Sequence, residues 1–332
     1  MSKRKEQWQA FRERNRKSGG YLLRKKIFNA GYRLCRAILI FGLCFLIIQP
    51  LLNKVSLSFM EEKDLYDSTI VSIPRNFTTA GYKLSAQLMK YWKALGTTTY
   101  ISLLVSIFQV AAATLVGYGF ARYKFPLKNF WFFMVILVII VPPQTIMAPL
   151  YLNFTYFNPL GLVKLVTGGK TLNLTNTMLP YLLLCLGCMG LKSGLYIYLI
   201  RQFFRNVPKD IEEAAYVDGC GKFKTFYRIM LPDAKPIITS CFLFAFVWQW
   251  TDKFYSRLFL RKYTLLSIEL DGLSGSLDAF LKGAGIAEKA SQAYSGAIVA
   301  TGTLMTIVPL LIIYIFAQKG FVESLSQSGI KM

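Results

Sequence analysis

The 332-residue chain contains no histidine, the side chain that most often serves as a general base or a zinc ligand. It also lacks a Gly-x-Ser-x-Gly sequence and any cluster of acidic residues suited to a metal ion. Six cysteines are present, and the spacing of Cys185 and Cys188 is one that redox and zinc sites use. Without histidine or a second such pair, we interpret these cysteines as small apolar residues of a helix. The sequence therefore predicts no catalytic residue, no metal site and no cofactor in this chain.

Charged residues are scarce, at 17%, whereas hydrophobic residues make up 54% of the chain. This ratio excludes an ordinary soluble domain and favours an integral membrane protein. The net charge of +22 would suit nucleic-acid binding in another context. Here, however, twelve of the 39 basic residues precede Ala37, and most others lie in short loops between apolar runs. Because this distribution is how membrane topology is encoded, we expect no nucleic acid as a partner.

Six apolar runs are each long enough to cross the hydrocarbon core as a helix. A helix is also the conformation that satisfies the backbone of such runs in lipid. The first run follows a basic region too long for a signal peptide, and no A-x-A-like cleavage site follows, so we interpret it as an uncleaved span. The predicted spans are Ala37–Leu57, Thr98–Phe120, Phe130–Tyr151, Met178–Phe203, Pro236–Phe254 and Ser295–Ala317.

The predicted fold class is therefore an all-α integral membrane protein with six transmembrane helices. Residues 1–36 form a basic N-terminal segment, and residues 37–332 form the transmembrane domain. Basic residues are concentrated in the N-terminal segment and in the loops 122–129 and 204–235. The positive-inside rule places these loops and both termini in the cytoplasm. For the N-terminal segment, the sequence is compatible both with an amphipathic helix on the membrane surface and with disorder.

Two local features have competing interpretations. Pro142, Pro143 and Pro149 predict a kink in the third span. Broken helices line cavities in transporters, but prolines also occur in plain membrane bundles, so both interpretations stay open. The sequence 168–171 (GGKT) resembles the end of a nucleotide-binding loop, but that motif needs a glycine where Lys164 stands. We expect no ATP binding by this chain.

The most informative stretch is the loop 204–235, which is expected to form a helix, a turn and a second helix. Asp210 and Glu213 have the spacing of a capping box, and Gly219 is placed to end the first helix in the left-handed region. Apolar residues recur at helical spacing between Lys222 and Leu231, and Pro232 is expected to end the second helix. From these properties alone, the loop either packs under its own bundle or offers a smooth small-residue surface to a partner.

The loop also resembles a known element. Glu213-Ala214-Ala215-x-x-Asp218-Gly219, followed by Phe226, Ile229 and Leu231-Pro232, is similar to the EAA loop of ABC importer permeases. Flanking stretches resemble the carbohydrate branch of that family, which includes the maltose G subunit. These stretches are Pro50–Leu52, Ser56–Phe59, Gly117–Phe125, Pro142–Gln144, Pro149–Tyr151, Arg201–Phe204, Trp250–Phe254 and Gln318–Lys331. The resemblance covers residues 37–332, although Thr251 replaces an asparagine of the family, and 164–177 and 273–292 depart from its pattern.

The resemblance implies a non-catalytic permease subunit that moves a sugar or oligosaccharide across the bacterial cytoplasmic membrane by alternating access. The implied partners are a second homologous permease, two ATPase subunits that bind ATP and Mg, an extracytoplasmic solute-binding protein and membrane lipid. Glu213 would contact basic groups of the ATPase, Ala214 and Gly219 would permit close approach, and Asp218 would brace the turn. The implied docking residues are Glu213, Ala214, Ala215, Asp218, Gly219, Phe226, Leu231 and Pro232.

A solute path is indicated less specifically. Lys192 lies in the middle of the fourth predicted span, where a charged residue marks a functional site by default, yet it could instead pair with an acid of the partner permease. Aromatic and polar residues near the end of the fifth span could stack on and bind sugars, but tryptophans at that depth also serve as membrane anchors. The candidate path residues are Lys192, Ser193, Trp248, Gln249, Trp250 and Asp252.

Other transporter classes fit the sequence less well. A secondary transporter predicts ionisable residues in several spans and repeated halves, whereas we find one lysine and no repeat. A structural membrane protein gives no reason for the spacing around Glu213. An ABC importer of amino acids, phosphate or polyamines would carry the same loop, and only the flanking matches favour sugars.

Overall fold

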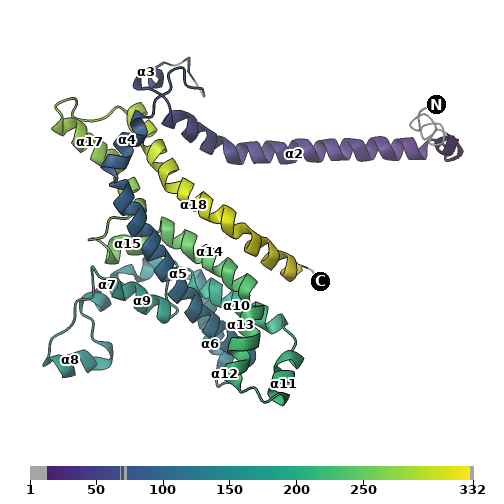
Figure 1. Cartoon of the computed structure of the whole chain (residues 1–332), viewed down its shortest axis with the longest axis vertical. Coiled ribbons are helices and arrows are strands. Elements are labelled where there is room, and N and C mark those ends of the chain that lie inside the picture. The colour runs from purple at the N-terminus through teal and green to yellow at the C-terminus, as the bar shows by residue number, and fades with distance from the viewer. Residues whose placement is uncertain (1–12, 68, 71–72, 330–332) are drawn as a thin grey trace. The chain divides into compact units, whose positions relative to one another are not determined.

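The computed structural model describes residues 13–67, 69–70 and 73–329, which divide into two compact units, 1–77 and 78–332 (Figure 1). Within the described residues the regular elements are helices, and β pairing is limited to two isolated bridges. The predicted all-α class is confirmed. Residues 1–12 of the predicted N-terminal segment and the last three residues of the predicted tail lie outside the described residues.

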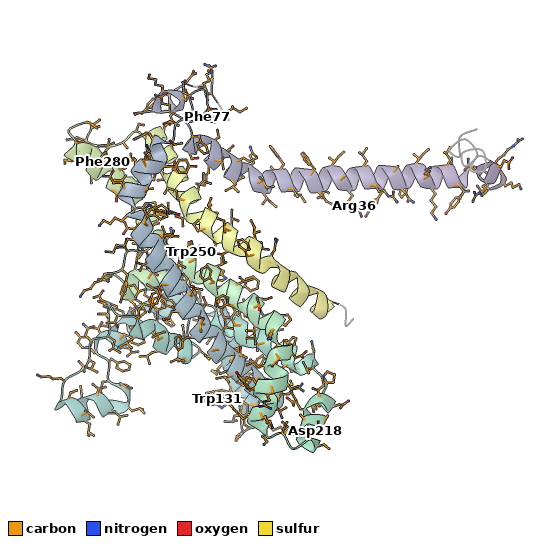
Figure 2. All side chains as sticks on the ribbon, in the orientation of Figure 1. Arg36, Phe77, Trp131, Asp218, Trp250 and Phe280 are labelled. Atoms are coloured by element: carbon orange, nitrogen blue, oxygen red, sulfur yellow. The ribbon has the colours of Figure 1, made fainter. Side chains whose placement is uncertain are left out.

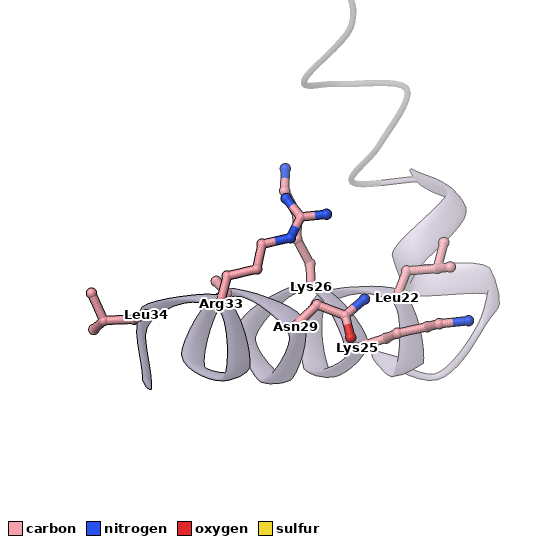
Figure 3. Close-up of a pocket in the computed structure, with 7 residues that line it drawn as sticks. Leu22, Lys25, Lys26, Asn29, Arg33 and Leu34 are labelled. Atoms are coloured by element: carbon pink, nitrogen blue, oxygen red, sulfur yellow. The ribbon is translucent and has the colours of Figure 1, made fainter. Parts of the chain in front are cut away.

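The first unit contains α2 (Tyr21–Ser58) and the short α3 (Glu62–Leu65). The boundary predicted at Ala37 does not interrupt α2, which runs through the basic segment into the apolar span. At 100° per residue, Lys25, Lys26, Arg33 and Arg36 fall on one side of this helix. A groove along its basic start is lined by Leu22, Lys25, Lys26, Asn29, Ala30, Arg33 and Leu34 (Figure 3).

Asp64 organises the loop that follows α2. Its buried carboxylate accepts hydrogen bonds from the backbone amides of Arg75 (2.8 Å) and Asn76 (2.7 Å) and from the Asn76 side chain (2.8 Å). The backbone bond from Asn76 is the main cause that lowers the pKa of Asp64 below its ordinary value. Because the folded-state pKa is depressed, this restraint is present above about pH 4 and is lost as the pH falls through the lowered pKa.

The second unit is built around α5 (Tyr91–Arg122), which packs against α4, α9, α10, α14 and α16. Small residues allow the closest of these contacts, since a Cβ at Gly117 would lie 2.9 Å from Cγ2 of Ile200 on α10. The remaining helices are α4 (Ala80–Leu88), α6 (Lys128–Ile140), α7 (Met147–Thr155), α8 (Leu162–Thr167), α9 (Leu179–Leu186), α10 (Ser193–Asn206), α11 (Asp210–Val217), α12 (Lys222–Thr225), α13 (Leu231–Asp233), α14 (Lys235–Thr251), α15 (Phe254–Phe259), α16 (Leu266–Asp271), α17 (Leu273–Gly283) and α18 (Gln292–Gly329), with 3₁₀ turns at Pro143–Ile146 (η1) and Pro159–Gly161 (η2) and a π-helical turn at Phe226–Met230 (η3).

The predicted count of six spans is not confirmed by the helices of the described residues. Three described helices, α2, α5 and α18, are long and apolar enough to cross a membrane, and the number rises to five if each of two bent helix pairs counts as one span. The first bent pair is α6 with the η1–α7 segment, where the axis turns by 99° beside Pro142 and Pro143. This bend confirms the proline kink predicted in the third span. The second pair joins Lys222–Asp233 to α14 at an angle of 73°.

The predicted continuous helix Met178–Phe203 is wrong, because residues 187–192 interrupt it between α9 and α10. Gly187 and Gly190 lower the helix propensity there, and Cys188 and Lys192 adopt left-handed backbone conformations with φ of 57° and 63°. A regular helix therefore ends at Leu186, and a new one starts at Ser193.

Candidate functional site: the loop between α10 and α14

The loop that follows α10 lies at the opposite end of the second unit from α4 and α17 (Figure 1). It contains α11, a turn, and a second helical segment made of α12, the π-helical turn and α13. Gly219 has φ of +76°, and the amide of Cys220 donates to the carbonyl of Ala215 at 2.9 Å, which closes α11 as a left-handed glycine ending does. The predicted helix, turn and helix, and the left-handed helix ending at Gly219, are confirmed. The second segment ends at Asp233, one residue beyond Pro232.

The capping box predicted from Asp210 and Glu213 is wrong. Lys209 occupies the cap position, no side chain caps the helix, and the carbonyl of Lys209 accepts the amides of Glu212 (2.9 Å) and Glu213 (3.0 Å). Pro208 fixes its own φ in the helical range, so the helical turn begins one residue before Asp210. Asp210 then lies in the first turn, where its charge still interacts favourably with the helix dipole.

The predicted docking residues divide between an inner and an outer side. Ala215 is buried, and Phe226 is buried with its ring centroid 4.7 Å from that of Tyr118 on α5. Leu231 is half-buried and Pro232 is exposed. Glu213, Ala214, Asp218 and Gly219 are exposed on the first helix and its turn, and so are the larger residues Ile211, Tyr216 and Val217. Figure 2 labels Asp218 at this end of the unit, away from Trp250.

Glu212, which sequence reasoning did not single out, fixes α11 to the long central helix. Its carboxylate accepts a hydrogen bond from the hydroxyl of Tyr118 at 2.9 Å and lies 3.3 Å from Nε of Arg122. Both ionic side chains are less than 10% exposed. The Arg122 guanidinium also donates from Nη2 to the carbonyl of Val207 at 2.7 Å, just before α11. We call Tyr118, Arg122 and Glu212 the α5–α11 clamp.

The sequence contains a signal for this clamp. Tyr118 and Arg122 are four residues apart, so they share one face of α5, and Glu212 lies three residues before Ala215 on the inner face of α11. The recognisable motif begins at the adjacent Glu213 and does not include Glu212. Only the packing of α11 on α5 distinguishes the glutamate that faces inward from the one that faces outward.

The break between α9 and α10 is held from α5. Gln109 is only 2% exposed, and its side-chain amide donates to the carbonyl of Leu191 and to the hydroxyl of Ser193, the latter at 2.9 Å. The space is tight, since a Cβ at Gly190 would lie 3.1 Å from the Gln109 nitrogen. Gln109 thus replaces part of the backbone hydrogen bonding that the interrupted helix loses.

The candidate path residues do not form one surface. Lys192 is exposed at the break, and its ammonium lies 5.0 Å from the centre of the Trp248 ring on α14, which is 45% exposed. Ser193 is beside them but is buried and bonded to Gln109. The structure therefore brings Lys192, Ser193 and Trp248 together.

The other three path residues point into the protein. Gln249 and Trp250 are buried, and the Trp250 indole donates to the carbonyl of Thr306 on α18 at 3.2 Å. Asp252 is buried and accepts hydrogen bonds from the hydroxyl of Tyr181 (2.7 Å) and from the amide and hydroxyl of Ser256 (2.9 Å each). These contacts give Trp250 and Asp252 a packing role in this chain, while their part in a solute path stays a prediction.

Comparisons with known proteins agree with this architecture. Residues 109–319 match the family described as binding-protein-dependent transport system inner membrane component. The arabinooligosaccharides transport system permease protein AraQ of Halalkalibacterium halodurans is 25% identical over 87% of this chain and 93% of its own length. The maltodextrin transport system permease protein MdxG of Bacillus subtilis is 26% identical over 90% and 96%, respectively.

A solved structure has the same fold. It is described as a bacterial ABC transporter involved in the import of the acidic polysaccharide alginate, and one of its chains superimposes with a TM-score of 0.64. The match covers 87% of this chain and 95% of that chain at 18% sequence identity.

Proposed function

Because the chain belongs to the family of binding-protein-dependent transport system inner membrane components, we propose that it is the permease subunit through which an ABC importer moves a carbohydrate into the cell. The names of the relatives support the solute class, since they describe permeases for arabinooligosaccharides and maltodextrin. The chain itself is a non-catalytic subunit, and ATP and Mg bind to its partners.

In this proposal α11 is the element that docks into an ATPase subunit. The observation that carries it is the division of α11 into two sides: Glu212 is clamped to α5, while Glu213, Ala214 and Asp218 are exposed. An exposed face with one small residue lets a partner's backbone approach closely. Because the clamped face fixes α11 to α5, a displacement of α11 would also move α5, the helix at the centre of the second unit.

The complete assembly comprises a second homologous permease, two ATPase subunits and an extracytoplasmic solute-binding protein, all embedded in or bound to the cytoplasmic membrane. Both termini and the loop between α10 and α14 lie in the cytoplasm, and transport proceeds by alternating access. The surface of α2 supports contact with lipid or with the second permease, since its apolar residues from Ile38 to Ile48 are exposed in the described unit.

The experiment that tests this function is the substitution Gly219→Asp. An aspartate at φ of +76° is strained, and its side chain would project from the proposed docking surface. We expect the complex to assemble, its ATPase activity to persist, and carbohydrate uptake to fall at least tenfold. The matched control is Gly285→Asp, because Gly285 is also exposed, has φ of +68° and has open space around it. Normal uptake in Gly219→Asp would refute the docking role.

The solute class is tested separately by measuring uptake with a set of labelled solutes in cells that carry the whole transport system. Uptake of an oligosaccharide that depends on ATP supports the proposal. Uptake of only amino acids, phosphate or polyamines would assign the chain to an importer of another solute. Uptake driven by an ion gradient without ATP would indicate a secondary transporter.

A further inference from the structure

Lys192 occupies a position that a membrane protein does not leave facing lipid. It lies at the interruption between α9 and α10, where the backbone is not helical. Irregular backbone at membrane depth is tolerated only inside protein or beside a water-filled cavity, and a lysine there is costly unless it has a polar environment. The exposed ammonium of Lys192 therefore faces a cavity or another polar group.

Lys192 and Trp248 lie at matching depths on neighbouring helices. From Ser193 to the end of α10 there are 14 residues, which span about 21 Å at 1.5 Å per residue. From the start of α14 to Trp248 the distance is about 20 Å by the same measure. Both side chains thus lie at about the same height along their helices, about 20 Å from the helix ends on the side that carries α11.

The backbone beside the lysine is anchored to another helix. Lys192 has φ of +63°, and the next residue, Ser193, is bonded to the buried amide of Gln109. The Lys192 ammonium lies over the ring of Trp248, a residue that is 45% exposed. A backbone anchored in this way loses less entropy when a ligand binds.

The charge at this place has no counter-ion in the described part of the chain. Its four ion pairs are Arg75–Asp67, Arg122–Glu212, Lys253–Asp271 and Arg257–Asp271, and none includes Lys192. The start of α10 adds the positive end of a 14-residue helix beside the ammonium. The local field therefore favours an anion.

We propose that Lys192 and Trp248 form a binding site in the transport path for an anionic carbohydrate, in which Lys192 holds an acidic group of the sugar and Trp248 stacks on the adjacent ring. This inference rests on the proposed function and specifies its solute class. A carboxylate fits the ammonium as a charge-assisted hydrogen-bond partner, and the apolar face of a sugar ring fits the exposed indole. Neutral sugars would use only the indole.

The test compares uptake of labelled trigalacturonate with its fully methyl-esterified form, which has the same rings without charge. Cells carry the complete transport system with wild-type, Lys192→Gln, Lys192→Arg or Trp248→Leu chains. The control is Lys282→Gln, since Lys282 is an exposed lysine on α17. Recovery of the intact complex by co-purification is measured for each variant.

We expect the wild-type chain to transport trigalacturonate. Lys192→Gln should raise the apparent KM for trigalacturonate at least tenfold and leave uptake of any neutral sugar unchanged, whereas Lys192→Arg should stay within about threefold of wild type. Trp248→Leu should impair acidic and neutral sugars alike, and Lys282→Gln should impair neither.

Three results would overturn the inference while leaving the proposed function intact. The wild-type system could transport neutral oligosaccharides only, or Lys192→Gln could transport trigalacturonate normally. Lys192→Gln could also lower the uptake of all sugars together with recovery of the complex, which would assign Lys192 to an ion pair with the second permease. Absence of ATP-dependent uptake of any carbohydrate by the wild-type system would refute the proposed function itself.

Discussion

The α5–α11 clamp makes a sharp prediction for the substitution Glu212→Gln. This change keeps the shape of the side chain and an oxygen that can accept the hydrogen bond from Tyr118, but it removes the negative charge beside Arg122. The buried Arg122 guanidinium then keeps its hydrogen bond to the Val207 carbonyl but has lost the carboxylate. We expect α11 to separate from α5 more often.

The magnitude follows from burial. Removing one partner of a buried ion pair costs about 3–5 kcal/mol, since the other charge is left uncompensated. Glu212→Gln retains hydrogen-bonding partners, so we expect the lower end, about 3 kcal/mol. At about 1.4 kcal/mol per factor of ten, the undocked fraction of α11 rises about a hundredfold. Little else opposes this opening, because Ala215 is the only other buried residue of this eight-residue helix.

The assay is amide hydrogen exchange of the full chain in lipid nanodiscs, followed by mass spectrometry of peptides from α11 and α5. Exchange of the amides between Ala214 and Cys220 should accelerate about a hundredfold in Glu212→Gln, because the undocked fraction of α11 rises by that factor. Exchange within α5 should change little. The matched control is Glu213→Gln, which makes the same chemical change one residue away on the exposed side.

A double-mutant cycle with Arg122→Met separates the ion pair from general damage. Once Glu212 is neutral, removing the arginine charge should cost less than it does in the wild-type chain, so the two effects should not add. The clamp does not hold α11 on α5 if the effects add, if Glu213→Gln accelerates exchange as much as Glu212→Gln, or if exchange rises throughout the chain.

Two further predictions concern restraints elsewhere in the chain. Gln109→Leu leaves the partly buried Leu191 carbonyl and the buried Ser193 hydroxyl without their donor, so we expect the free energy of unfolding to fall by about 1–3 kcal/mol in SDS titrations. An equal loss in Gln49→Leu, on the exposed face of α2, would contradict this. Asp64→Ala removes the acceptor that closes the loop after α2, so tryptic cleavage in that loop should accelerate, whereas Glu62→Ala, an exposed neighbour, should cleave at the wild-type rate.

The sequence determined the class of the protein and the position of its recognisable loop. A high apolar content with few charges predicts membrane helices because lipid satisfies no backbone group, and this inference needs no tertiary information. The left-handed ending at Gly219 and the bend beside Pro142 are likewise local consequences of residue type. These features depend on interactions within a few residues, so they can be predicted from neighbours in the chain.

The tertiary structure decided which residues of the site face each other. The hydrogen bonds that hold the interruption at 187–192 come from Gln109, about 80 residues away, and the clamp joins Glu212 to a helix that ends at Arg122. A hydropathy profile scores residues 178–203 as one apolar run, because it does not include the hydrogen bonds that the buried Gln109 side chain on α5 donates to the break. Likewise, spacing alone cannot separate exposed Trp248 from buried Trp250. Burial and pairing between distant segments are properties of packing. They place Glu212 inside the clamp and leave Lys192 exposed.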